Sequence, residues 1–97
     1  MFWAYMLQCA DASYYVGHTE DLEYRLAQHL AGTFVTCYTY KRRPVHLVWS
    51  QVFDTRIEAL EAERRIKGWS RAKKQALIGG DWGKINRLAR GKHRHER

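Results

Sequence analysis

The first apolar and polar pattern in the chain predicts a β-hairpin. Two segments rich in aromatic and apolar residues, 2–8 and 14–17, enclose a short turn-tolerant stretch. A two-residue loop between them would place Tyr5 and Tyr15 on opposite faces of the hairpin, whereas an odd loop or a bulge would bring both to one face. The sequence leaves this register open.

A helical pattern follows the hairpin. Leu22, Leu26 and Leu30 recur at four-residue spacing, which is typical of an amphipathic helix. Thr19 offers an N-cap before this pattern, and Gly32 offers a stop behind it. We therefore expect the first helix between these two residues.

The second half of the chain predicts one strand and three helices. Residues 45–53 form a β-branched and aromatic run, and Thr55-Arg56-Ile57-Glu58 is a capping box for a helix. Ser70 and Asp81 offer the N-caps of two further helices. The order β-β-α-β-α-α-α predicts an α+β fold with a small, mainly antiparallel three-stranded sheet flanked by helices.

Length and charge narrow the class of protein. The 97 residues predict one domain, placed at residues 1–90, before a basic tail at 91–97 that we expect to be disordered. A formal net charge of +7 suits a polyanionic partner, of which nucleic acid is the commonest, and equally suits a basic protein whose charge only keeps it in solution. The sequence has no apolar run long enough to span a membrane and no secretion-signal pattern, so we expect a cytoplasmic protein. Cys9 and Cys37 lack the close spacing of zinc ligands and are interpreted as buried, small apolar residues.

Glu63 is a charged residue on the apolar face of the second predicted helix. It shares one helical face with the apolar residues Ala59, Ala62 and Ile66. Burying a carboxylate is costly unless it is paired or holds a metal ion. Either Glu63 pairs with Lys67 one turn away or it binds a metal, and the pattern alone favours the pair.

Arg25 and His29 lie one turn apart beside the leucine stripe of the first predicted helix. Two cationic donors at this spacing suit an anion such as phosphate. The commoner interpretation is a solvated Arg and a His that favours the helix dipole.

Taken together, these positions form a recognisable series. Trp3-Ala4-Tyr5 and Tyr15-Val16-Gly17 are two triplets that each contain a Tyr, residues 21–29 carry an Arg and a His on a helix, and Glu63 follows on a later helix. The series resembles the GIY-YIG family of nuclease domains over about residues 2–80. The resemblance is to its small stand-alone bacterial branch, similar to the N-terminal domain of the C subunit of the excision-repair nuclease.

The resemblance implies metal-dependent endonuclease hydrolysis of phosphodiester bonds, normally in DNA, with a place in DNA repair. One Mg²⁺ or Mn²⁺ ion would bind Glu63 and would be absent without substrate. Tyr5 would be the general base, and Arg25 would hold the charge on the phosphoryl oxygens. Tyr15 and His29 would orient water and phosphate.

Basic residues outside this centre are expected to bind the nucleic-acid backbone. They are Lys41, Arg42, Arg43, Lys67, Arg71, Lys73 and Lys74. Such contacts give affinity without reading sequence. The alternative on the same fold is a non-catalytic module that binds nucleic acid or docks a partner, and in either case a protein partner could supply substrate specificity.

Overall fold

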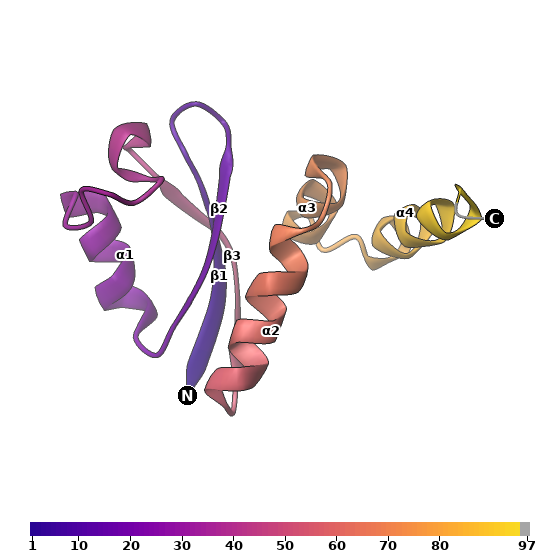
Figure 1. Cartoon of the computed structure of the whole chain (residues 1–97), viewed down its shortest axis with the longest axis horizontal. Helices are drawn as coiled ribbons and strands as arrows, with labels where there is room; N and C mark the ends of the chain where they lie inside the picture. Colours follow the sequence, from indigo (N-terminus) through magenta and orange to yellow (C-terminus); the bar gives the residue numbers. More distant parts are fainter. Residues whose placement is uncertain (96–97) are drawn as a thin grey trace. The chain divides into compact units, whose positions relative to one another are not determined.

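The computed structural model describes the backbone of residues 1–95 and the side chains of residues 1–88. The chain divides into two compact units, Met1–Lys67 and a second that begins at Gly68. The elements of the first unit are β1 (Phe2–Gln8), β2 (Tyr14–Thr19), α1 (Leu22–Ala31), a 3₁₀ turn η1 (Tyr40–Arg42), β3 (His46–Phe53) and α2 (Arg56–Lys67) (Figure 1). The α+β class and the predicted order of strands and helices are confirmed.

The sheet is antiparallel with the strand order β2-β1-β3. Tyr5 pairs with Gly17, and Leu7 pairs with Tyr15. Because paired residues share a face and side chains alternate along a strand, Tyr5 and Tyr15 lie on the same face. The loop between the two strands has an odd length, which resolves the register that the sequence left open.

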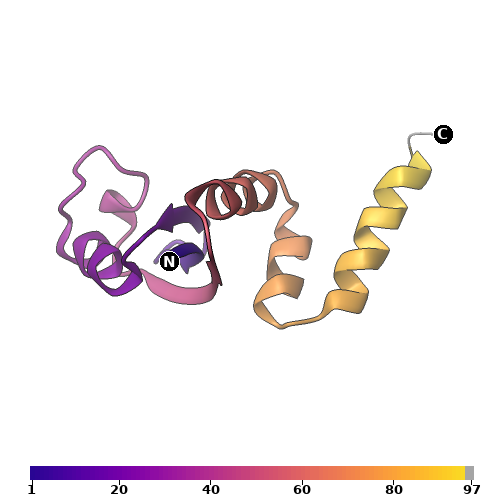
Figure 2. The same ribbon diagram turned by 90° about the horizontal axis from the view of Figure 1, so that it is seen from below.

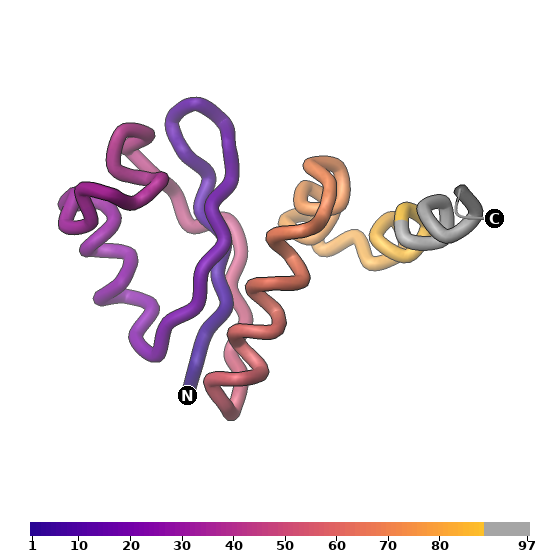
Figure 3. The backbone as a smooth tube through the Cα atoms, in the orientation of Figure 1, coloured from indigo at the N-terminus to yellow at the C-terminus, as the bar shows by residue number. Residues whose placement is uncertain are grey.

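The helices α1 and α2 cover opposite faces of the sheet, as two perpendicular views show (Figures 1 and 2). On the α1 face, Tyr5 and Leu7 form a buried cluster with Cys9 and Val45. Figure 3 draws the backbone as a tube and shows the β1–β2 hairpin between α1 and α2. On the α2 face, the alternate strand residues pack against the helix, whose Ala59 is fully buried.

Local signals set the helix ends. Thr55 and Glu58 form the predicted capping box, with each backbone N–H donating to the other side chain at 3.2 Å. The first helix instead uses Asp21 as its N-cap, whose Oδ1 accepts from the N–H of Tyr24 at 3.1 Å. The prediction of Thr19 as this cap was wrong because Thr19 is the last residue of β2 and is buried by strand pairing.

The second unit consists of α3 (Arg71–Ile78) and α4 (Trp82–His95). The predicted caps are confirmed, since Ser70 Oγ accepts from Lys73 N–H and Asp81 Oδ1 accepts from Lys84 N–H. The predicted tail at 91–97 overlaps the end of α4 at 91–95, and its side chains and residues 96–97 lie outside the described part of the chain, so its disorder stays a prediction. None of the helices that the structure describes is long and apolar enough to cross a membrane.

Candidate active site

A chain of two hydrogen bonds joins Tyr5 on β1, His29 on α1 and Thr39 in the loop before η1. Tyr5 Oη lies 3.0 Å from His29 Nε2, and His29 Nδ1 lies 2.8 Å from Thr39 Oγ1. These residues are only 1%, 2% and 1% exposed. Three polar side chains therefore satisfy one another inside an apolar environment, which fixes their geometry.

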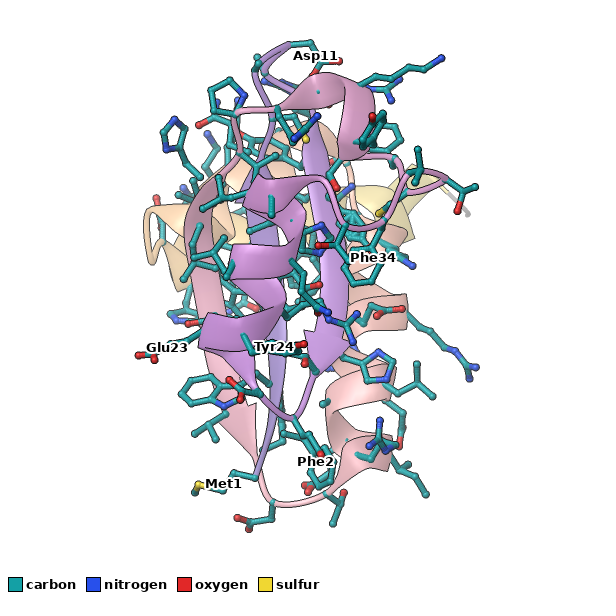
Figure 4. All side chains as sticks on the ribbon, turned by 90° about the vertical axis from the view of Figure 1, so that its left-hand side faces the viewer. Met1, Phe2, Asp11, Glu23, Tyr24 and Phe34 are labelled. Atoms are coloured by element: carbon teal, nitrogen blue, oxygen red, sulfur yellow. The ribbon has the colours of Figure 1, made fainter. Side chains whose placement is uncertain are left out.

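Two aromatic rings enclose the histidine. The Tyr15 ring centroid lies 5.1 Å from that of His29 and 6.3 Å from that of Tyr5. Phe34 makes an edge contact with His29 at 5.5 Å, and Figure 4 shows it beside α1. The guanidinium of Arg25 lies over the Phe34 ring at 5.2 Å, so the arginine is held next to the same cluster.

Glu63 enters from α2 and is held by two donors. Its Oε1 lies 2.8 Å from His18 Nδ1, and its Oε2 accepts from Lys67 Nζ at 3.1 Å. The Glu63 side chain is 12% exposed. Burial acts to raise its pKa, but the hydrogen bonds from His18 and Lys67 outweigh burial and hold the pKa below its usual value. Glu63 is therefore an anion at neutral pH.

The tyrosines and the His18–Glu63 pair lie on opposite faces of the sheet, and β2 contributes a residue to each. His18, next to Gly17 in the strand, points to the α2 face by alternation, whereas Tyr15 points to the α1 face. β2 is an edge strand, and α2 packs against it. The negative charge of Glu63 contributes to raising the pKa of Tyr5 and Tyr15, and the positive charge of Arg25 opposes it. The charges of Arg25 and Glu63 thus both influence the pKa of the two predicted tyrosines, and the charge of Arg25 also influences that of His29.

Burial dominates the titration of the aromatic groups. It raises the pKa of Tyr15 to about 12 and raises that of Tyr5 further. Burial, with the nearby charge of Arg25, lowers the pKa of His29. In the resting protein the shared proton therefore belongs to the phenol and not to the imidazole.

Cys37 contradicts its sequence interpretation. It is half-buried, and its Sγ accepts a hydrogen bond from Thr39 Oγ1 at 3.5 Å. Burial acts to raise the Cys37 pKa, but hydrogen bonds from Thr39, from the Tyr15 hydroxyl and from the Tyr38 backbone outweigh it and lower that pKa. The prediction of a buried, purely apolar thiol was wrong because the loop supplies hydrogen-bond donors that composition does not reveal. Cys9 is buried, as predicted.

Sequence reasoning missed His18, Thr39 and Phe34. His18 directly follows the second triplet. Because side chains alternate along a strand, its position three residues after Tyr15 was the one signal that it faces the opposite side of the sheet, toward α2. Thr39 and Phe34 lie in an irregular segment with no periodicity, so no pattern indicated that they contact His29.

The basic residues of the first unit mostly have partners within the protein. Arg42 stacks over Tyr38 at 3.8 Å and donates to Asp11 at 3.0 Å. Arg43 stacks over Tyr40 at 4.7 Å. Lys67 is bound to Glu63, as described above, and Lys41 is exposed. The remaining predicted contacts, Arg71, Lys73 and Lys74, belong to α3 in the second unit.

Comparison with known proteins places these residues in a family. The profile described as "GIY-YIG catalytic domain" matches residues 1–76, which includes every side chain of the site. The chain belongs to the GIY-YIG family. The resemblance inferred from the two triplets, the helical Arg and His, and Glu63 is thereby confirmed.

The relatives to which this chain is similar include UPF0213 proteins. One from Bacillus pumilus is 46% identical over 74 residues, which cover 76% of this chain and 74% of the relative. One from Halobacterium salinarum is 44% identical over 78 residues, covering 80% of this chain and all of the relative. The solution structure of the UPF0213 protein of Bacillus halodurans is 36% identical with a TM-score of 0.53, and covers 81% of this chain and 84% of that one.

Proposed function

We propose that this chain is a metal-dependent phosphodiesterase that cleaves nucleic acid, with DNA as the substrate that the family suggests, at the centre formed by Tyr5, Arg25 and Glu63. The observation that carries the proposal is an anionic, mostly buried carboxylate whose charge acts on a buried tyrosine that is hydrogen-bonded to a histidine. Structural packing alone does not require these groups to share one electrostatic environment. The GIY-YIG family supports nuclease chemistry.

Glu63 fits a single, weakly bound Mg²⁺ or Mn²⁺ ion. Among the described residues, no group of three or more His, Cys, Asp or Glu side chains is arranged to hold a metal ion. Mg²⁺ commonly takes one or two protein carboxylates and completes its shell with water and substrate phosphate. Lys67, whose side chain is 54% exposed, can leave Oε2 to such an ion. When bound, the ion would polarise the scissile phosphate and stabilise the leaving 3′ oxygen.

Tyr5 needs a proton acceptor to serve as general base. Its raised pKa makes a free phenolate rare at neutral pH, and His29 Nε2 lies within hydrogen-bond distance of the hydroxyl. As the attacking water forms the new P–O bond, its proton passes to Tyr5 Oη while the phenol proton passes to His29 Nε2. The bond from phosphorus to the 3′ oxygen breaks, that oxygen takes a proton from solvent, and His29 returns its proton to solvent.

Arg25 would bind the phosphoryl oxygens as negative charge develops on them. Its guanidinium remains charged under all physiological conditions and presents a fork of donors that matches phosphate. Stacking on Phe34 positions it without consuming those donors. Tyr15 would orient water or phosphate from the opposite side of His29.

The basic residues would bind the nucleic-acid backbone outside the centre. Lys41 is exposed, and those on α3 form a separate group in the second unit. Such contacts position the substrate and do not read bases. A partner protein that supplies substrate specificity stays a prediction.

Cleavage assays on single-stranded, nicked and branched DNA, with Mg²⁺ or with chelator, test the proposal. Tyr5→Phe and Glu63→Gln should each lower the cleavage rate at least about 100-fold while DNA binding is retained. The matched controls are Tyr24→Phe and Glu61→Gln, which change exposed residues of the same types. Cleavage by Glu63→Gln at the wild-type rate would refute the proposal.

One observation favours a second candidate function, a non-catalytic module that binds nucleic acid. Both oxygens of Glu63 and the hydroxyl of Tyr5 are already hydrogen-bonded within the protein. A site that is fully satisfied without substrate can be purely structural. Retained DNA binding together with chelator-insensitive or absent cleavage on every substrate would favour this module.

A further inference from the structure

The hydrogen bond between Tyr5 and His29 allows two arrangements of protons. In one, Tyr5 O–H donates to an unprotonated Nε2. In the other, Nε2–H donates to the phenol oxygen, and the tyrosine proton must point elsewhere. Only the first arrangement lets Tyr5 give its proton to His29, so the tautomer of the imidazole decides whether the pair can work as a base.

The partner at the far side of the ring selects between these arrangements. Thr39 has one hydroxyl hydrogen, and its Oγ1 donates that hydrogen to Cys37 Sγ at 3.5 Å. The oxygen, 2.8 Å from His29 Nδ1, is then left to accept. Nδ1 therefore carries the ring hydrogen, and Nε2 presents its lone pair to Tyr5.

We propose that Thr39 is a positioning residue that holds His29 in its Nδ1–H tautomer, so that Tyr5 is oriented to pass its proton to His29. The proposal about the tautomer concerns the resting protein. Its consequence for cleavage rests on the proposed function above.

The loop that carries Thr39 is built to hold this hydroxyl in place. Backbone hydrogen bonds join Cys37 N–H to the Phe34 carbonyl at 2.9 Å, Tyr40 N–H to the Cys37 carbonyl at 3.0 Å and Arg42 N–H to the Thr39 carbonyl at 3.0 Å. These successive turns hold the loop in a conformation in which the Thr39 hydroxyl lies between Cys37 Sγ and His29 Nδ1.

Burial strengthens the preference of His29 for one tautomer. Thr39 and His29 are 1% and 2% exposed, so water has little access to replace a missing partner. Throughout the part of the chain with described side chains, no buried side-chain nitrogen or oxygen lacks a hydrogen-bond partner. The opposite tautomer would leave Nδ1 and Thr39 Oγ1 as two acceptors facing each other unless the hydroxyl abandoned Cys37.

Nitrogen-15 NMR of the histidine ring tests the proposal without any assay of activity. His29→Gln assigns the signals, and the wild-type protein should show a protonated Nδ1 and an unprotonated Nε2 for His29. Thr39→Val removes the hydroxyl at nearly constant volume, and we expect it to convert His29 wholly or partly to the Nε2–H tautomer. Thr39→Ser should restore the wild-type pattern. A wild-type spectrum with Nε2–H would overturn the proposal even if Thr39→Val did not fold.

A variant of Cys37 independently tests the direction of the Thr39 hydrogen bond. Cys37→Ala removes the acceptor of the Thr39 hydrogen, which is then free to turn toward Nδ1. We expect a mixture of His29 tautomers in this variant and the wild-type tautomer in Cys37→Ser. An unchanged spectrum in both Cys37→Ala and Thr39→Val would show that the loop does not set the tautomer.

The cleavage assay adds the catalytic consequence. Thr39→Val should lower kcat about 10- to 100-fold with KM nearly unchanged, and Thr39→Ser should recover most of the loss. A shifted tautomer with unchanged kcat would overturn the catalytic consequence alone. Absence of cleavage by the wild-type protein on every substrate would refute the proposed function, while the ring spectrum would still decide the role of Thr39.

Discussion

Tyr5 Oη lies directly over Gly17, its partner across the β1–β2 ladder. A β-carbon placed on Gly17 would approach this oxygen to 2.6 Å, which is closer than real side chains tolerate. Gly17 is therefore needed for space and not for an unusual backbone angle. It lets the phenol extend across β2 to His29, which links the two triplets of the family by direct contact.

Gly17→Ala should displace the Tyr5 ring and weaken its hydrogen bond to His29. Because the ring is buried and rigid, we expect the free energy of unfolding in urea to fall by about 1–3 kcal/mol. Gly79→Ala is the control, since its β-carbon would find its nearest neighbour at 3.6 Å, an ordinary contact. Equal stability of Gly17→Ala and the wild-type protein would contradict this reading of the glycine.

The Glu63 carboxylate should stabilise the fold in a pH-dependent way. Its pKa is lower in the folded state than in the unfolded state, so its contribution is present above the unfolded value of about 4.3 and is lost as pH falls through the folded pKa. Glu63→Gln should therefore cost about 1–2 kcal/mol near neutral pH and less in acid. Urea unfolding at several pH values measures this difference, and exposed Glu61→Gln should show none of it.

Arg25→Lys keeps the charge but loses the planar fork and its stacking on Phe34. We expect cleavage to fall at least about tenfold, with little change in thermal stability. Single-turnover kinetics at saturating protein isolates the chemical step. A variant that cleaves at the wild-type rate would show that positive charge alone is sufficient at this position.

Lys41→Gln should weaken nucleic-acid binding through loss of one phosphate contact. Lys41 is exposed, and no side-chain partner of it is seen in the described structure, whereas Arg42 and Arg43 are stacked on tyrosines. The slope of log affinity against log salt concentration should fall by about 0.7–0.9. Arg56→Gln is the control, because Arg56 already pairs with Glu20 and stacks over Phe2. An unchanged slope for Lys41→Gln would remove it from the interface.

Signals confined to a few residues were sufficient for most of the fold. The capping box at Thr55 and Glu58 and the left-handed Gly32 at the end of α1 are determined by neighbours within one helical turn. The shared face of Tyr5 and Tyr15 was not predictable, because it depends on the parity of a loop whose conformation includes Ala12 at a positive φ of 68°. A one-residue difference there would reverse the outcome.

The site was predictable only where the family pattern supplied its residues. His18 and Glu63 are 45 residues apart in the sequence, so no local pattern predicted their contact. Glu63 also pairs with Lys67, and this pairing does not exclude the metal-binding interpretation. Thr39 reaches His29 because an irregular loop folds back over α1. No periodicity encodes such a contact, since it depends on the tertiary path of the loop.

The division of the chain after Lys67 separates the proposed catalytic residues from one group of the proposed nucleic-acid contacts. The tyrosines, Arg25, His29 and Glu63 all precede the boundary, whereas the cations of α3 follow it. Under the proposed function, substitutions in α3 would change the affinity for nucleic acid and leave the proton-transfer residues unaltered. Affinity and chemistry could then be altered separately in the laboratory, by variants on either side of Lys67.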